Sequence, residues 1–213
     1  MSNTVLLEVK DGIGYITINR PAALNALSSE VLTDLNLVLD EVEKHEDIRV
    51  VIVSGQGDKA FVAGADIKEM DQMSPIQAFE YMTYANDTFT RLSDLTQPTI
   101  AVLNGYALGG GLELALSTDI RIGFEKTMVG FPEVGLGIIP GFAGTQRMSR
   151  LIGTSRTKEL IYTARIVKGN EAYDLGILNK LVPAEELMSA AEELAKSIMK
   201  NAPLAVETAK HVI

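Results

Sequence analysis

Three consecutive glycines, Gly109–Gly111, stand between a strand-like run and a short helical segment, and they constrain this chain more than any other feature. Glycine in a helix interior costs roughly 0.5–1 kcal/mol relative to alanine. Three in a row therefore indicate that something approaches the backbone closely, either a ligand or a packed strand, and the pattern favours neither. The first N–H groups of a helix lack intrahelical partners and favour negative charge. A helix that begins here could hold a developing oxyanion.

Two glutamates accompany this helix start. Glu113 falls one turn after Gly110, and Glu133 follows Pro132 within an otherwise apolar stretch. Taken alone, Glu113 is more simply interpreted as a capping residue that accepts backbone N–H bonds. Glu133 is costly to bury unless it is paired, and a dry pocket raises the pKa of a carboxyl group toward the range of a general acid. Together the two residues predict proton transfer to and from carbon beside an oxyanion site.

Composition excludes several other classes of function. Among 213 residues, 28 acidic and 19 basic side chains give a net charge of -9, which argues against binding to nucleic acid or an anionic membrane. Cys is absent, and His45 and His211 are the two histidines, so neither a metal site nor a serine–histidine pair is expected. No apolar run approaches the ~20 residues of a membrane span, and no secretory signal is visible. We expect a cytoplasmic protein.

Strand-like and helical patterns alternate along the chain, which predicts an α/β architecture with parallel pairing. A hairpin is expected to turn at Asp11-Gly12, and Ser28 is expected to cap the helix that follows. One domain with a small appendage is expected from the length. The predicted strands are 5–9, 14–18, 50–55, 99–103, 119–123 and one within 177–182, and the predicted helices cover 31–42, 76–95 and 112–116.

Long motifs, in order along almost the whole chain, resemble the crotonase (enoyl-CoA hydratase/isomerase) superfamily. The small-residue segment Ala63–Asp66 would alone indicate no more than a turn after a strand. The resemblance gives this segment a meaning because it rests on several segments together. These are 19–21, 25–27, 61–70, 104–113, 131–137 and 140–147.

The resemblance implies a spiral of ββα units and a CoA thioester whose adenosine lies near Asn25. It implies an oxyanion hole formed by the N–H groups of Ala65 and Gly110, and catalysis by Glu113 and Glu133. The implied positions that contact the substrate and CoA are Ala63, Ala65, Asp66, Ile67, Lys68 and Gly110.

By the same resemblance, the expected reaction is the reversible hydration of a trans-2-enoyl-CoA, most simply a short-chain one, in fatty-acid or butyrate-type metabolism. Retention of both glutamates favours hydration, since relatives with other reactions commonly lack one of them. The alternatives are an enoyl-CoA isomerase of the same superfamily and a non-catalytic acyl-CoA-binding module. No cofactor and no metal are expected, and the expected assembly is a homotrimer or a dimer of trimers. One departure is Phe131, where hydratases often carry Gln, and it could alter the pocket near Glu133.

The C-terminal region is expected to be helical and shortened. Residues 1–195 would form the crotonase-like core domain, and residues 196–213 would begin the helical region that covers the pocket and joins subunits in relatives. A helical pattern that begins near Pro203 ends at Ile213, where relatives continue with further helices. The expectation is a truncated C-terminal region, which places binding, assembly and activity in question.

Overall fold

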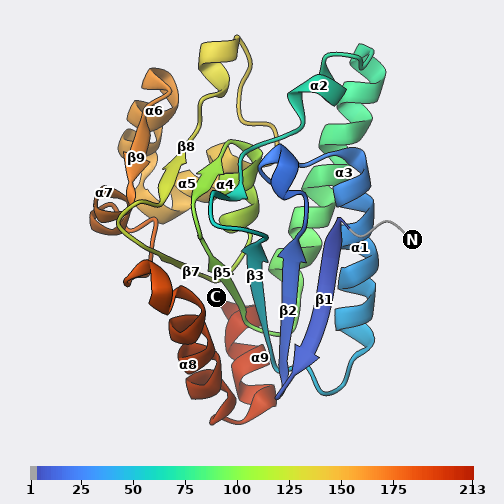
Figure 1. Ribbon diagram of the computed structural model, residues 1–213, viewed down its shortest axis with the longest axis vertical. Coiled ribbons are helices and arrows are strands. Elements are labelled where there is room, and N and C mark those ends of the chain that lie inside the picture. The colour runs from blue at the N-terminus through green and yellow to red at the C-terminus, as the bar shows by residue number, and fades with distance from the viewer. Residues whose placement is uncertain (1–3) are drawn as a thin grey trace.

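The computed structural model describes residues 4–213, which fold around two β-sheets (Figure 1). The large sheet has the order β1-β2-β3-β5-β7-β10, and within it only β1 and β2 pair in antiparallel fashion. The small sheet has the order β4-β6-β8-β9, with β8 and β9 antiparallel. The strands are β1 Val5–Lys10, β2 Ile13–Ile18, β3 Val50–Gly55, β4 Ala60–Val62, β5 Thr99–Val102, β6 Tyr106–Leu108, β7 Ile120–Gly123, β8 Met128–Gly130, β9 Ile166–Lys168 and β10 Lys180–Leu181.

Helices cover both faces of the large sheet. The α-helices are α1 Ser29–Lys44, α2 Ile67–Met70, α3 Pro75–Asp94, α4 Gly110–Ala115, α5 Gly144–Ile152, α6 Thr154–Thr163, α7 Gly169–Asp174, α8 Leu187–Met199 and α9 Pro203–Val212. The short 3-10 helices are η1 Pro21–Ala23, η2 Glu133–Leu136 and η3 Ala184–Glu186. Within residues 4–213, no helix is both long and apolar enough to cross a membrane.

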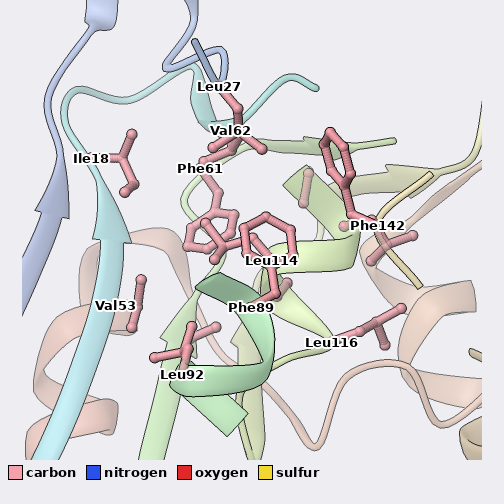
Figure 2. Packing of buried hydrophobic residues seen from close by; sticks show 14 of the residues in the cluster. Ile18, Leu27, Val53, Phe61, Val62, Phe89, Leu92, Leu114, Leu116 and Phe142 are labelled. Carbon is pink, nitrogen blue, oxygen red and sulfur yellow. The ribbon is translucent and has the colours of Figure 1, made fainter. Parts of the chain in front are cut away.

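The two faces of β3 explain why its sequence is continuously apolar. Val51 and Val53 belong to the core under α1 and α3, whereas Val50 and Ile52 belong to the core under α8. Successive side chains of a strand point to opposite faces, so a strand that is covered on both faces needs apolar residues at every position. Figure 2 shows Val53 in the larger core, which also holds Phe61, Phe89 and Leu114.

Most of the predicted elements are confirmed. The hairpin turns at Asp11 and Gly12 with a pairing of Lys10 to Ile13, and the Ser28 hydroxyl accepts the N–H of Val31 at the start of α1. The strand predicted within 177–182 is real but contains two residues, Lys180–Leu181. The predictions lack β4, β6, β8 and β9, which have three residues each and are therefore too short to display an alternating pattern.

These short strands complete the ββα spiral that the resemblance implies. β3, β5 and β7 are neighbours in the large sheet, and the strands that follow them in sequence, β4, β6 and β8, are neighbours in the small sheet. The small sheet pairs Val62 with Ala107 and Leu108 with Gly130, all in parallel register. The carboxyl ends of these three strands therefore lie at one edge, where ligands of parallel α/β sheets commonly bind.

Candidate active site at the carboxyl edge of the small sheet

Two backbone amides meet just beyond this edge. Ala65 and Gly110 each lie three residues after a paired position, Val62 in β4 and Ala107 in β6. Leu27 lies next to both residues. It forms a β-bridge with Ala65, and a Cβ atom built on Gly110 would lie 3.2 Å from Cδ1 of Leu27. Within the described residues, neither the Ala65 N–H nor the Gly110 N–H donates to a protein acceptor. Two N–H groups without a protein acceptor are what the predicted oxyanion hole requires.

The glycine run serves packing as well as access. A Cβ on Gly111 would overlap the carbonyl oxygen of Val62, so glycine allows α4 to lie directly against β4. A Cβ on Gly110 would lie 2.8 Å from the ring of Phe142, and Gly109 has a φ of +50°. The packing interpretation of the run is therefore confirmed at Gly111, and the approach of a ligand to Gly110 stays a prediction.

Glu113 is buried and tightly held. Its exposed fraction is 1%, and Oε1 accepts the N–H groups of Phe142 at 2.8 Å and Gly144 at 2.7 Å. It does accept backbone N–H bonds, as the capping interpretation expects, but from the N-terminus of α5 instead of its own helix. The ring of Phe142 anchors this loop, since it packs edge-on against Tyr81 and Phe89 with ring centroids 5.7 Å apart in both pairs. Figure 2 shows Phe142 beside this core.

Burial controls the protonation of Glu113. Loss of hydration raises its pKa from 4.5 to about 7, although the two N–H bonds from the loop oppose the rise. The negative charge of Glu133 raises the pKa further, and the positive charge of Arg147 lowers it. Glu113 therefore changes its protonation state near neutral pH, where a general acid or base is most effective.

This raised pKa predicts a pH dependence of stability. The folded protein holds the Glu113 proton more tightly than the unfolded chain, so the free energy of unfolding falls as pH rises from 4.5 to about 7. We expect a contribution on the order of 2–3 kcal/mol between pH 5 and pH 8. Urea unfolding of wild type and Glu113→Gln at the two pH values measures it, because the variant lacks the titrating group. Identical pH dependence in both proteins would contradict the prediction.

Glu133 lies opposite the glycine run. It is the first residue of η2, has an exposed fraction of 9%, and its Oε1 lies 2.6 Å from where a Cβ on Gly109 would stand. Its Oε2 is buried with no hydrogen-bond partner among the described residues. Burial raises the pKa of this carboxyl group as well. A buried carboxylate oxygen without a protein partner is suited to meet a ligand or a water molecule.

The predicted contact positions Ala63, Asp66, Ile67 and Lys68, at the start of α2 and just before it, differ in their surroundings. The carboxylate of Asp66 accepts the Glu69 N–H and forms an ion pair with Arg20 at 3.1 Å. Ala63 donates its N–H to the Leu24 carbonyl at 3.1 Å. Ile67 and Lys68 are exposed on α2 near the same edge. Asn25 itself is buried, and its amide donates to the carbonyls of Gln56 and Ala60, so it shapes its loop.

Sequence reasoning assigned no role to the residues that hold Glu113. The segment 140–147 contributed to the resemblance, but nothing in its pattern indicates that the amides of Phe142 and Gly144 converge on a distant carboxylate. Phe131 is fully buried, and its ring lies 2.7 Å from where a Cβ on Gly144 would stand. This phenylalanine therefore packs behind the loop that holds Glu113.

A cavity lies at the other end of the small sheet. It has a volume of about 960 Å³ and is lined by Lys59, Tyr106 and Met128, at the amino ends of β4, β6 and β8. The glutamates and open amides do not line it. Within residues 4–213, no group of three or more His, Asp or Glu side chains could hold a metal ion.

Comparison with known proteins identifies the family of this chain. Residues 8–213 match the family described as Enoyl-CoA hydratase/isomerase. The short-chain-enoyl-CoA hydratase of Clostridium acetobutylicum is 48% identical over 99% of this chain and 81% of its own length. The crotonyl-CoA hydratase of Syntrophomonas wolfei is 40% identical over 97% of this chain and 79% of its own. The crystal structure of an enoyl-CoA hydratase from Bacillus anthracis superposes with a TM-score of 0.96 at 40% identity, covering 98% of this chain and 81% of that one. This chain therefore belongs to the enoyl-CoA hydratase/isomerase family.

Proposed function

We propose that this protein is an enoyl-CoA hydratase that reversibly adds water to a short trans-2-enoyl-CoA and forms the 3-hydroxyacyl-CoA. The observation that carries the proposal is the pair of buried carboxyl groups, Glu113 and Glu133, beside two open backbone amides at one sheet edge. The named activities of the Clostridium and Syntrophomonas relatives support the same reaction.

In the proposed mechanism, a water molecule between the two glutamates attacks C3 of the enoyl group. Glu113 accepts a proton from that water, and Glu133 donates a proton to C2. The negative charge that develops on the thioester oxygen is stabilised by the N–H groups of Ala65 and Gly110. One oxyanion-hole donor typically contributes about 10²–10³ in rate, and one proton-transfer group about 10²–10⁴. The reverse reaction exchanges the acid and base roles.

The electrostatics of the site support the sharing of one proton between the two glutamates. Burial raises the pKa of both glutamates, so one proton is readily shared between them near neutral pH. Glu113 sits at the N-terminus of α5, whose dipole favours its ionised form. Oε2 of Glu133 has no hydrogen-bond partner among the described residues, so it can exchange a proton with a water molecule or a ligand.

We propose that Ala63, Asp66, Ile67 and Lys68 line the thioester and the pantetheine arm. Ile67 exposes an apolar side chain and Lys68 exposes an ammonium group. These support contacts with the apolar and the negatively charged groups of CoA, respectively. The adenosine is placed near the Asn25 loop, where a hollow of about 190 Å³ lies between residues 21–25 and 56–60.

The remaining proposals concern organisation. The reaction is proposed to need no cofactor, because water, two carboxyl groups and two amides complete the proton transfers. Residues 1–195 are proposed as the core domain and 196–213 as part of a helical region that joins subunits in a homotrimer or dimer of trimers. Support comes from α9, where Leu204 and Val212 are 75% and 74% exposed. A cytoplasmic location is supported by the lack of Cys, which makes the fold independent of disulfides.

The test is hydration of crotonyl-CoA, followed as the loss of enoyl absorbance. We expect turnover by the wild type and a decrease of about 10²–10⁴-fold in kcat for Glu133→Gln, since the amide cannot deliver a proton. Glu125→Gln, an exposed change at the opposite edge of the sheet, is the matched control and should leave kcat unchanged.

Two results would contradict the proposal. A wild type that binds crotonyl-CoA without turnover would indicate a binding module. A wild type that converts 3-enoyl-CoA to 2-enoyl-CoA but does not hydrate crotonyl-CoA would indicate an isomerase, an activity that also appears in the name of the relative from Mycosarcoma maydis.

A further inference from the structure

Arg147, one turn into α5, is a half-buried cation in an unusual position. Its Nη1 donates to the carbonyl oxygen of Phe142 at 3.1 Å, and its Nη2 lies 3.5 Å from Oγ of Ser93. Within the described part of the chain, no carboxylate lies at ion-pair distance from its guanidinium. A charge removed from water without a direct counterion is costly. Its presence therefore needs an explanation.

The contacts of Arg147 lead back to Glu113 from two sides. Phe142 accepts from Arg147 through its carbonyl and donates to Glu113 through its N–H. On the other side, the Ser93 hydroxyl donates to the Ser117 carbonyl at 3.1 Å, and the Ser117 hydroxyl donates to the Glu113 carbonyl at 2.9 Å. Four residues, Arg147, Phe142, Ser93 and Ser117, thus connect the carboxylate of Glu113 to its backbone carbonyl.

Charge interactions accompany these contacts. The positive charge of Arg147 lowers the pKa of Glu113, and the negative charge of Glu113 raises the pKa of Arg147. Burial is the largest influence on both groups and acts against both charges. The other charged or titratable groups that face this pair are Glu133 from η2, Tyr81 and Asp94 from α3, and Arg150 from α5. Arg147 is the cation that the structure sets against the buried carboxylate of Glu113.

We propose that Arg147 is a positioning residue for the proposed hydration. Its guanidinium holds the Phe142 carbonyl, in the peptide group between the two whose N–H groups donate to Glu113, and its charge favours the ionised carboxylate. The inference rests on the proposed role of Glu113 as the base that accepts a proton from water. Arg147 is thus proposed to act on Glu113 in two ways: through the hydrogen bond that holds the loop at 142–144 and through its positive charge. Each contribution can be removed alone.

The test is the titration of the Glu113 carboxyl group by NMR in protein labelled with ¹³C-carboxyl glutamate, with the resonance assigned by its loss in Glu113→Gln. We expect Arg147→Gln to move the midpoint upward by roughly half a pH unit or more, because a nearby positive charge is removed. Arg147→Lys keeps the charge and should leave the midpoint closer to the wild type. The exposed neighbour Arg150, changed to Gln, is the matched control and should change the midpoint little.

Hydration kinetics provide the second measurement. In Arg147→Gln, the acidic limb of the plot of kcat/KM against pH should move to higher pH, by about as much as the NMR midpoint of Glu113. An NMR midpoint that is the same in wild type and Arg147→Gln would overturn the inference even if hydration is confirmed. A midpoint that moves without any change in the pH profile would leave the electrostatic link intact and contradict the catalytic role of Glu113.

The Lys variant keeps the test decisive if Arg147→Gln does not fold. A midpoint in Arg147→Lys within the range of the Arg150→Gln control supports the role of charge. A midpoint raised by half a pH unit or more in the Lys variant, which retains the charge, contradicts it. Folding of each variant is checked by far-UV circular dichroism before titration.

Discussion

Replacing Glu113 with Gln is expected to lower kcat for crotonyl-CoA hydration by about 10²–10⁴-fold. The amide oxygen of Gln can still accept the N–H groups of Phe142 and Gly144, so the loop keeps its position. What is lost is the carboxylate that accepts the proton of the attacking water. The same change removes a buried charge, so the variant should be at least as stable as the wild type at pH 8. A protein that is stable and inactive identifies a chemical role.

The measurement combines steady-state hydration with urea unfolding at pH 8. Isomerisation of 3-enoyl-CoA, if the wild type has any, should be less affected than hydration, because it does not need an activated water. Equal survival of both activities in Glu113→Gln would count against its assignment as the hydration base. An unfolded or strongly destabilised variant would instead indicate that Glu113 holds the loop at 142–144 as an anion.

Gly109→Ala is expected to reduce both hydration and stability. Gly109 has φ +50° and ψ -123°, a conformation essentially restricted to glycine, so alanine should cost about 1–3 kcal/mol. The added Cβ would also lie 2.6 Å from Oε1 of Glu133, and the carboxylate must move away. Because Glu133 is proposed to deliver the proton to C2, kcat should fall to a degree similar to that of Glu133→Gln, about 10²–10⁴-fold.

Gly153→Ala separates the two effects. Gly153 also has a positive φ of +84°, but a Cβ there would meet nothing within 4 Å. This variant should lose stability without losing kcat. Hydration rates and thermal unfolding of both variants, measured side by side, decide the matter. A wild-type kcat in Gly109→Ala, or an equal loss of kcat in Gly153→Ala, would show that contact with Glu133 is not the cause.

The strands of the large sheet were predictable because each carries its own signal. β3 is apolar at successive positions, and β2 follows a turn that Asp11 and Gly12 encode locally. The strands of the small sheet were not predictable. β6, β8 and β9 have three residues each, too few for a periodic pattern, and their pairing depends on partners far away in the chain.

Some features of the candidate site were likewise predictable from the sequence, and others were not. The motifs indicated Glu113, Glu133, Ala65 and Gly110 through a family resemblance, and the structure places all four at the carboxyl edge of the small sheet. The roles assigned to them remain predictions that the variants above test. The partners of Glu113 on α5 were not predicted, because a backbone amide has no sequence signature.

By itself, the sequence determined the family, the alternation of strands and helices, and the glycines that allow α4 to lie against β4. Only the tertiary structure decided that the charge of Glu133 acts on Glu113 and that burial brings the pKa of Glu113 to about 7. It also decided that α5 and the loop before it direct two amides and Arg147 toward Glu113. The physical reason is the separation along the chain over which each effect acts. Turn chemistry and hydrophobic periodicity act over a few neighbouring residues, whereas desolvation and charge pairing depend on every segment that packs around a group.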